Sequence, residues 1–190
     1  IPDGWSFVQA ASVPAVFLTA YYGLVDLAGL KAGESLLLHG AAGGVGMTTL
    51  AYCAVAPDGC GTPNELVLTP EVTPGLARLA DAVHAEGAAV SAQLGHAGAV
   101  AAGTGLPGLS PSPVFSPLAM KRTKAVSPER IRGIVDDFAA AARVVADAGC
   151  DVVEVHLGHG YLPSEFLSPR LNKRTDEWGG SLENRARFPR

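Results

Sequence analysis

The sequence is poor in cysteine and in charge, and both shortages limit what the protein can be. Three cysteines, Cys53, Cys60 and Cys150, form no C-x-x-C pair and leave an odd thiol. This argues against a disulfide framework or a cysteine-rich metal site, and it favours a reducing, cytoplasmic setting. Only 17% of the 190 residues are charged and 48% are hydrophobic, so the chain has enough apolar material for a core.

Basic clusters and long apolar runs are also missing. The 14 lysine and arginine residues are spread along the chain and the net charge is -4, which argues against nucleic acid or an anionic membrane as a partner. The most apolar stretch, Val13 to Leu30, is interrupted by Asp26, Thr19, two tyrosines and two glycines. We therefore expect one soluble domain without a membrane span.

From about Met47 onward, strand-like and helix-like segments alternate. The expected strands are residues 47–55, 88–94 and 150–156, which are short and rich in apolar residues. The expected helices are residues 73–88 and 127–149, in which apolar residues recur at helical spacing. The pattern predicts strands joined by helical crossovers.

The helix ends carry their usual signals. Thr73 and Ser127 are expected N-caps, because a side-chain oxygen there can accept a hydrogen bond from a free backbone N–H. Gly87 and Gly149 are expected to end these helices in the left-handed conformation. Ser181 is expected to cap a further helix near the end of the sequence.

Two parallel crossovers suit either a doubly wound sheet or part of an eight-stranded α/β barrel. Polar residues stand where three successive strands pass into the loops that follow them. They favour the barrel, where loops from different strands converge on one site. These residues are Tyr52 and Cys53, Gln93 and His96, and His156 and His159. The predicted fold class is therefore α/β, a partial (β/α)8 TIM barrel with about three parallel strands and crossover helices. The long Gly-, Pro- and Ser-rich segment 95–127 is expected to be functional or to cover a site.

A Rossmann-like strand and glycine-rich turn, "ESLLLHGAAGGVG", precede this barrel pattern. With "VPAVFLTAYYGLVDLAGLKAGE" before it, the turn resembles the start of medium-chain dehydrogenase/reductases of the quinone oxidoreductase and enoylreductase branch. Residues 1–46 are accordingly expected to be a dehydrogenase-like segment. That fold requires a helix after Gly46, whereas "MTTLAYCAV" favours a strand, so a simple tight turn at Gly43, Gly44 and Gly46 is the alternative.

Four motifs carry a second resemblance: "GGVGMTTLAYCAVAPDG", "LADAVHAEGAAVSAQLGHAG", "DVVEVHLGHGYLPSEFLSP" and "NKRTDEWGGSLENRARF". From about Gly43 to Arg190 the chain resembles the old yellow enzyme family of FMN-dependent NADH:flavin oxidoreductases and ene-reductases. The resemblance implies a partial FMN-binding barrel over residues 47–190. It also implies reduction of FMN by NAD(P)H and reoxidation by an electron-poor alkene or quinone. Self-association into a homo-oligomer is left open.

The resemblance also implies roles for individual residues. His156 and His159 stand where two imidazole N–H groups stabilise charge on one carbonyl oxygen. Tyr161 stands at the position of the proton donor to the α-carbon. Gln93 matches the amide that contacts the pyrimidine edge of the flavin, and Tyr52 falls at a strand end that lies against the flavin.

Other readings remain open from the sequence alone. Glu154 with His156 and His159 offers three metal ligands, but the spacing completes no zinc site, so no metal is expected. An NADPH-dependent quinone oxidoreductase or enoylreductase, or a non-catalytic remnant, is the alternative to the flavin enzyme. Because the pattern accounts for about three of eight barrel strands, this chain alone is expected to bind FMN weakly or not at all.

Overall fold

The structure, a computed structural model, describes residues 46–101, 108–116 and 120–190. The chain divides into two compact units, residues 1–37 and 38–190, and every described residue belongs to the second. The dehydrogenase-like segment 1–46 lies outside the described residues except for Gly46, as does the apolar stretch from Val13 to Leu30.

Three parallel strands form the main sheet, in the order β1-β2-β7. They are β1 (Met47–Ala54), β2 (Ala89–Gly95) and β7 (Val152–Val155), and both neighbouring pairs run parallel. All three coincide with the predicted strands. Since the strands are parallel, their carboxyl ends meet at one edge of the sheet, which is where the polar residues of the sequence accumulate.

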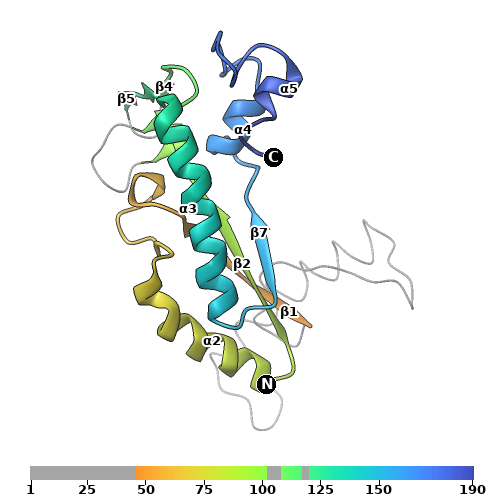
Figure 1. The fold of residues 1–190 in the computed structure, drawn as a ribbon. Helices are drawn as coiled ribbons and strands as arrows, with labels where there is room; N and C mark the ends of the chain where they lie inside the picture. Colours follow the sequence, from red (N-terminus) through yellow and green to blue (C-terminus); the bar gives the residue numbers. More distant parts are fainter. Residues whose placement is uncertain (1–45, 102–107, 117–119) are drawn as a thin grey trace, which may run out of the picture. The chain divides into compact units, whose positions relative to one another are not determined.

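Two long helices make the crossovers, α2 (Thr73–Ala85) and α3 (Pro128–Asp147). They pack against each other and against one face of the sheet (Figure 1). The apolar layer between helices and sheet is the first of two core clusters. Its buried members are Cys53, Val55, Leu68, Leu76, Ala92, Leu94, Ala141, Val144, Val145 and Ala148.

Most of the predicted helix ends are confirmed. The Ser127 hydroxyl accepts a hydrogen bond from the Arg130 N–H at 3.2 Å, and Gly87 and Gly149 have φ angles of 78° and 80°. Thr73 is not the N-cap that the sequence predicts. A 3-10 turn, η3 (Pro70–Val72), runs directly into α2, so Thr73 already has helical dihedral angles.

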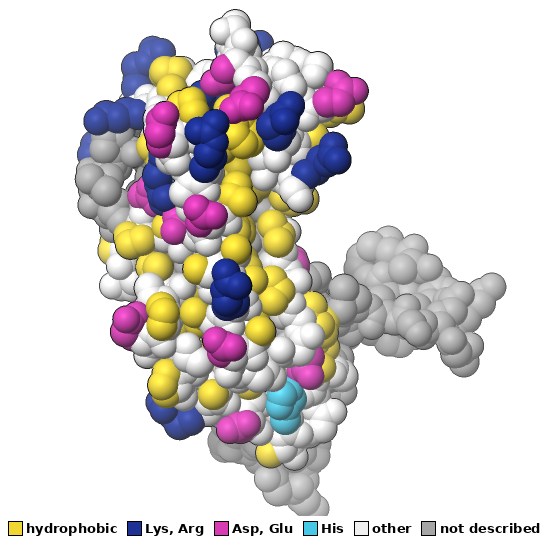
Figure 2. Space-filling view, in the orientation of Figure 1, with side chains coloured by type: hydrophobic (Ala, Val, Ile, Leu, Met, Phe, Trp, Pro, Cys, Tyr) yellow, Lys and Arg dark blue, Asp and Glu magenta, His cyan; other side chains and the backbone are white. Residues whose placement is uncertain are grey.

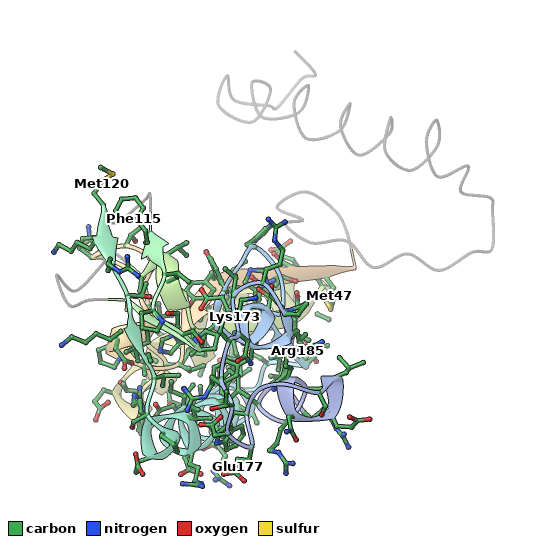
Figure 3. All side chains as sticks on the ribbon, turned by 90° about the horizontal axis from the view of Figure 1, so that it is seen from above. Met47, Phe115, Met120, Lys173, Glu177 and Arg185 are labelled. Carbon is green, nitrogen blue, oxygen red and sulfur yellow. The ribbon has the colours of Figure 1, made fainter. Side chains whose placement is uncertain are left out.

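Segment 95–127 contains more regular structure than the sequence predicts. After the turn η4 (Gly98–Val100), β3 (Leu109–Ser110) pairs with β6 (Lys124–Ala125). A second ribbon joins β4 (Phe115–Ser116) to β5 (Lys121–Arg122). Strands of two residues are too short for a sequence period to reveal them. Phe115 and Met120 stand exposed at the outer end of this ribbon (Figure 3).

The chain after β7 forms two short helices, α4 (Leu162–Leu167) and α5 (Leu182–Arg185). Ser181 caps α5 as predicted, because its hydroxyl accepts the Asn184 N–H at 3.2 Å. The second core cluster lies beneath these helices. Its members are Val126, Ile131, Ile134, Leu162, Phe166, Trp178 and Phe188.

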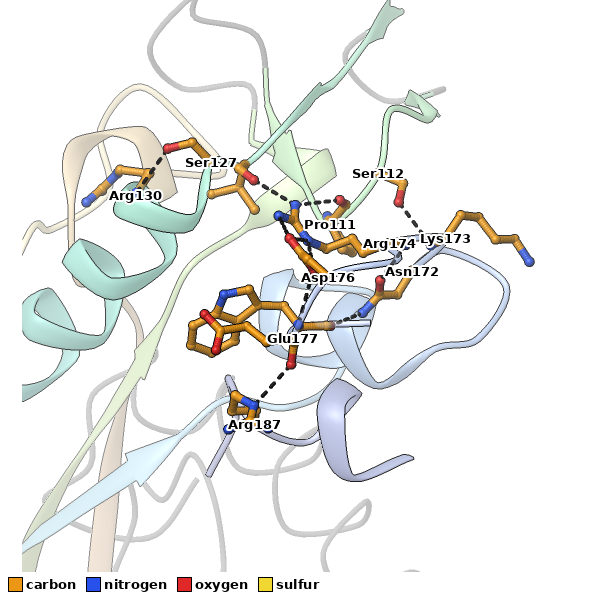
Figure 4. A network of polar contacts seen from close by, with 12 residues as sticks. Pro111, Ser112, Ser127, Arg130, Asn172, Lys173, Arg174, Asp176, Glu177 and Arg187 are labelled. Carbon is orange, nitrogen blue, oxygen red and sulfur yellow. Dashed lines mark hydrogen bonds and ion pairs between the residues drawn. The ribbon is translucent and has the colours of Figure 1, made fainter. Parts of the chain in front are cut away.

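A polar network fixes the loop between α4 and α5 to the rest of the fold (Figure 4). The Asn172 amide donates to the carbonyls of Phe166 and Trp178, at 2.9 and 2.8 Å. The Arg174 guanidinium donates to the Val126 carbonyl at 2.7 Å. The loop motif "NKRTDEWGG" therefore has a structural task, since its side chains satisfy buried backbone carbonyls from both sides.

The surface of the described part is mixed in charge and partly apolar. On the face shown in Figure 2, side chains of opposite charge alternate rather than gathering by sign. At the free edge of the sheet, Val152, Val153 and Val155 of β7 are 40 to 48% exposed. Among the residues that are described, no helix combines the length and the apolar character that crossing a membrane requires.

Candidate active site at the carboxyl edge of the sheet

The carboxyl ends of the three strands are held in register by backbone hydrogen bonds. Ala54 of β1 pairs with Gly95 of β2, and the His156 N–H, just after β7, donates to the Leu94 carbonyl at 2.8 Å. The chain then turns back, and the Leu162 N–H at the start of α4 donates to the His96 carbonyl at 2.9 Å. Side chains that leave these three strand ends consequently lie close together.

The two predicted histidines contact each other. His156 Nε2 lies 3.0 Å from His159 Nδ1, and the ring centroids are 4.9 Å apart. His156 is 9% exposed, and burial together with the neighbouring His159 lowers its pKa below the ordinary 6.5. His159 is exposed and has a φ of 55°, a conformation that few residues other than glycine adopt, and Gly160 follows with a φ of 68°.

This geometry suits the binding of one oxygen atom by two donors. Because its pKa is lowered, His156 is neutral at pH 7. One of its ring nitrogens then carries a proton and donates a hydrogen bond, and the other accepts one. In the unliganded site, one proton between His156 Nε2 and His159 Nδ1 forms the hydrogen bond that joins the two rings. An oxygen that approaches both nitrogens can accept a hydrogen bond from each once both carry protons, which stabilises negative charge on it.

Tyr161 packs against this pair. Its ring centroid lies 4.7 Å from that of His156, with the planes at 82°, and 6.1 Å from that of His159. It stands at the N-cap of α4, and its N–H donates to the Gly158 carbonyl at 3.0 Å. Burial raises the pKa of its phenol above the ordinary 10, so the hydroxyl keeps its proton at neutral pH and is able to donate it.

Tyr52 joins the same cluster from β1. Its ring centroid is 5.2 Å from that of Tyr161 and 6.2 Å from that of His156, and its hydroxyl donates to the Gly59 carbonyl at 2.8 Å. Burial raises the pKa of this phenol strongly. Gly95 leaves room for the ring, because a Cβ there would lie 2.1 Å from Tyr52 Cε2. Its assignment as a flavin contact stays a prediction.

Gln93 lies on β2 opposite Glu154 of β7. Its Nε2 donates to Glu154 Oε1 at 2.7 Å, and within the described part of the chain the carbonyl oxygen and the second N–H of the amide have no further bond recorded. An acceptor beside a donor is what the pyrimidine edge of a flavin requires, since that edge carries both kinds of group. The residue is compatible with its predicted role, which stays a prediction, and the hydrogen bond to Glu154 orients the amide.

Two of the polar strand-end residues do not join the cluster. Cys53 is 3% exposed within the first core cluster, where burial raises its pKa to about 11, so it is an unreactive packing residue. His96 is fully buried. Its Nδ1 accepts the Gly98 N–H at 3.2 Å, and its Nε2 lies 3.4 Å from Asp58 Oδ1.

Three residues that support the site escaped the sequence analysis: Asp58, Arg130 and Glu165. Arg130 donates to both carboxylate oxygens of Asp58, at 2.9 and 2.7 Å, and so ties α3 to the turn after β1. Burial alone would raise the pKa of Asp58, but the nearby His96 and the hydrogen-bonded Arg130 together outweigh it and lower the pKa. Residues so far apart in sequence give no local signal. Glu165, a lone carboxyl within the apolar run "LPSEFLSP", did offer one.

The three candidate metal ligands of the sequence are Glu154, His156 and His159. Within the ranges that the structure covers, no group of three or more histidine, cysteine, aspartate or glutamate side chains is placed to hold an ion. Gln93 engages one oxygen of Glu154, and His156 and His159 turn their nitrogens toward each other.

Comparison with known proteins identifies the family. The model of the NADH:flavin oxidoreductase / NADH oxidase family matches residues 37–190. The chain is 52% identical over 152 residues to 4,4'-dithiodibutanoate disulfide reductase of Rhodococcus erythropolis, covering 79% of this chain and 38% of that protein. It is 42% identical over 151 residues to NADPH dehydrogenase of Halalkalibacterium halodurans, covering 79% and 44%.

Solved structures agree with this result. Morphinone reductase in complex with tetrahydroNAD superposes with a TM-score of 0.71 at 31% identity, over 75% of this chain and 45% of that chain. 2-Naphthoyl-CoA reductase superposes with a TM-score of 0.73 at 34% identity, over 77% and 24%. The chain thus spans less than half the length of each of these relatives.

These findings do not support the dehydrogenase resemblance of residues 1–46. The family match begins at residue 37, inside that segment, and none of the relatives above is a medium-chain dehydrogenase. The structure adds a physical reason, because Met47–Ala54 is a strand where a dinucleotide-binding turn would continue into a helix. The parallel sheet with its crossovers is part of a TIM barrel, and the chain belongs to the NADH:flavin oxidoreductase / NADH oxidase family.

Proposed function

We propose that the protein is an FMN-dependent oxidoreductase that uses NAD(P)H to reduce activated C=C bonds, with an electron-poor alkene or quinone as substrate. The observation that carries this proposal is the approach of His156 Nε2 and His159 Nδ1 to 3.0 Å, beside the Tyr161 ring. Two donors aimed at one oxygen, with a protonated phenol at hand, suit the polarisation and protonation of an unsaturated carbonyl compound.

FMN fits the edge at which these residues lie. Gln93 would hold its pyrimidine edge through the carbonyl oxygen and second N–H of the amide, which Glu154 orients. When bound, FMN supplies the hydride that it has received from the nicotinamide cofactor. Tyr52, beside Tyr161, is proposed to border the same space.

The protein side chains then have separate tasks. His156 and His159 hold the carbonyl oxygen of the substrate and stabilise the negative charge that develops there when the β-carbon accepts hydride. Tyr161 gives its phenolic proton to the α-carbon, which completes the reduction of the double bond. The wall formed by Tyr52 and Tyr161 excludes water and so strengthens both interactions.

Phenol binding tests this proposal. Residues 47–190 would replace the matching segment of a complete relative, such as the NADPH dehydrogenase of Halalkalibacterium halodurans, and the hybrid would be loaded with FMN. A phenolate held over oxidised flavin by two histidines is expected to give a long-wavelength charge-transfer band. The double variant His156→Ala/His159→Ala should lose the band, because the oxygen loses both donors.

A third histidine serves as the control. His84, at the opposite end of the sheet, pairs with Asp151 at 2.8 Å, so His84→Ala should keep the band. A band that survives in the double variant refutes the assigned roles of the histidines. A hybrid that folds but binds neither FMN nor phenol favours the non-catalytic alternative.

A further inference from the structure

Glu165 is a buried carboxyl that the proposed chemistry does not use. It lies in α4 and is 1% exposed. Its Oε1 accepts the Ala99 N–H at 2.8 Å, while its Oε2 has no hydrogen-bond partner among the described residues. The fit is tight, since a Cβ on Gly98 would lie 2.7 Å from Oε1. Buried carboxyl oxygens usually have a hydrogen-bond partner, so the unpartnered Oε2 calls for a physical explanation.

Two hydrogen bonds make Glu165 part of a clamp. The Ala99 N–H donates to Glu165 Oε1, and in the opposite direction the Leu162 N–H donates to the His96 carbonyl at 2.9 Å. Together they fasten the first turn of α4 to the turn that follows β2. Tyr161 immediately precedes Leu162, so the clamp holds the backbone from which the Tyr161 ring packs against His156.

Among the residues that the structure describes, no cation is paired with this carboxyl. Of the elements packed against α4, η4 and β3 carry no titratable group. Helix α3 shares the second core cluster with α4, and its arginines Arg130 and Arg132 are paired with other carboxylates. On α5, Glu183 is fully exposed, and Arg185 donates to the carbonyls of Leu167 and Gly180. His96 uses Nδ1 to accept the Gly98 N–H. Within the described residues, Glu165 has no ion pair, so only the neutral acid suits this environment.

We propose that Glu165 is a positioning residue whose neutral carboxylic acid clamps α4 to the turn after β2 and so holds Tyr161 against His156. The neutral acid presents a carbonyl oxygen to the Ala99 N–H and keeps its proton on the other oxygen. Ionisation would place an uncompensated charge in an apolar site. Although a carboxylate accepts the Ala99 N–H more strongly than a neutral acid does, the cost of burying the charge would draw the side chain toward solvent and loosen the clamp. The consequence for proton donation by Tyr161 rests on the proposed function, whereas the clamp itself does not.

The acidity of the group agrees with this role. Burial raises the pKa of Glu165 from 4.5 to about 8, and the hydrogen bond from the Ala99 N–H opposes this shift. Glu165 is therefore neutral at pH 7 and ionises near pH 8, where the clamp is expected to loosen. His156, with a pKa below 6.5, and Tyr161, with a pKa above 10, do not titrate between pH 7 and 9.

Tyrosine NMR of the intact chain tests the proposal without flavin or activity. With tyrosine 13C-labelled, the chain gives signals from four tyrosines, and Tyr161→Phe identifies the one that matters. The Tyr161 signal should shift with a midpoint near pH 8. In Glu165→Gln it should keep its neutral-pH position up to pH 9, because the amide reproduces the uncharged acid.

The same substitution at an exposed carboxyl, Glu183→Gln, is the matched control and should retain the transition near pH 8. The proposal is overturned if the wild type shows no transition between pH 7 and 9, or if Glu165→Gln shows the same transition. A Tyr161 signal that is displaced in Glu165→Gln already at pH 6.5 also overturns it. If the Tyr161 signal shows the expected transition but the charge-transfer band survives in His156→Ala/His159→Ala, the proposed function is refuted and the clamp is not.

Discussion

The buried carboxyl of Glu165 should make the stability of the chain depend on pH. The folded state holds the proton up to about pH 8, whereas the unfolded state releases it near pH 4.5. Between these values the unfolded chain binds fewer protons than the folded chain, so raising the pH favours unfolding. This contribution to stability is fully present below pH 4.5, and it declines until the folded group also ionises.

The size of the effect follows from linkage. Each pH unit within this interval lowers the free energy of unfolding by about 1.4 kcal/mol. At pH 7 the free energy of unfolding should be lower than at pH 4.5 by roughly 3 kcal/mol. Glu165→Gln removes the titrating proton and keeps the acceptor for the Ala99 N–H, so this slope should vanish in the variant.

Urea unfolding followed by circular dichroism at several pH values measures this difference. The free energy of unfolding of Glu165→Gln minus that of the wild type should grow by about 1.4 kcal/mol per pH unit from pH 5 to 8 and then level off. The exposed Glu183 provides the control substitution, and Glu183→Gln should not reproduce the slope. A difference that stays constant across the interval would refute the neutral, buried acid.

Three further changes test the packing beneath the site. Gly95→Ala should displace the Tyr52 ring, because Cε2 would lie 2.1 Å from the new Cβ, and should lower the free energy of unfolding by about 1–3 kcal/mol. An unchanged near-ultraviolet circular dichroism spectrum would contradict this. Asp58→Asn should lower the free energy of unfolding by about 1–2 kcal/mol at pH 7, because Arg130 loses its carboxylate partner. The pKa of Asp58 is lowered on folding, so that loss should shrink in acid, and a loss independent of pH would exclude the ion pair as its cause. Ser127→Ala should lower the free energy of unfolding by about 1 kcal/mol through loss of the α3 cap, which thermal denaturation can detect.

Local sequence signals were most informative where the structure is local. The three strands, the caps at Ser127 and Ser181, and the helix ends at Gly87 and Gly149 depend on neighbouring residues, and all were predicted correctly. Thr73 was misassigned because a hydroxyl before an apolar helix is a cap only if the chain before it is extended. Here Pro70 starts a 3-10 turn that continues into α2.

Of the candidate site residues chosen from the sequence, the structure brings some into contact and buries others elsewhere. Motif spacing selected His156, His159 and Tyr161, and the structure brings these side chains into contact; their catalytic roles stay predictions. Sequence position also suggested Cys53 and His96, but the fold buries the first in the core and the second beneath a turn. Polarity at a strand end does not reveal which face a side chain takes, because that depends on local twist and on the bulge in β1.

The sequence by itself determined the alternation of strands and helices, the family motifs and the spacing of the two histidines, since each of these is written in residues close together along the chain. Only the tertiary structure decided that Asp58 meets Arg130, that Tyr52 lies against Tyr161, and that Ala99 meets Glu165. Partners separated by 66 or more residues, such as Ala99 and Glu165, come together only when the parallel sheet aligns its strand ends. The low polarity that keeps a carboxyl neutral is likewise a property of the packed core.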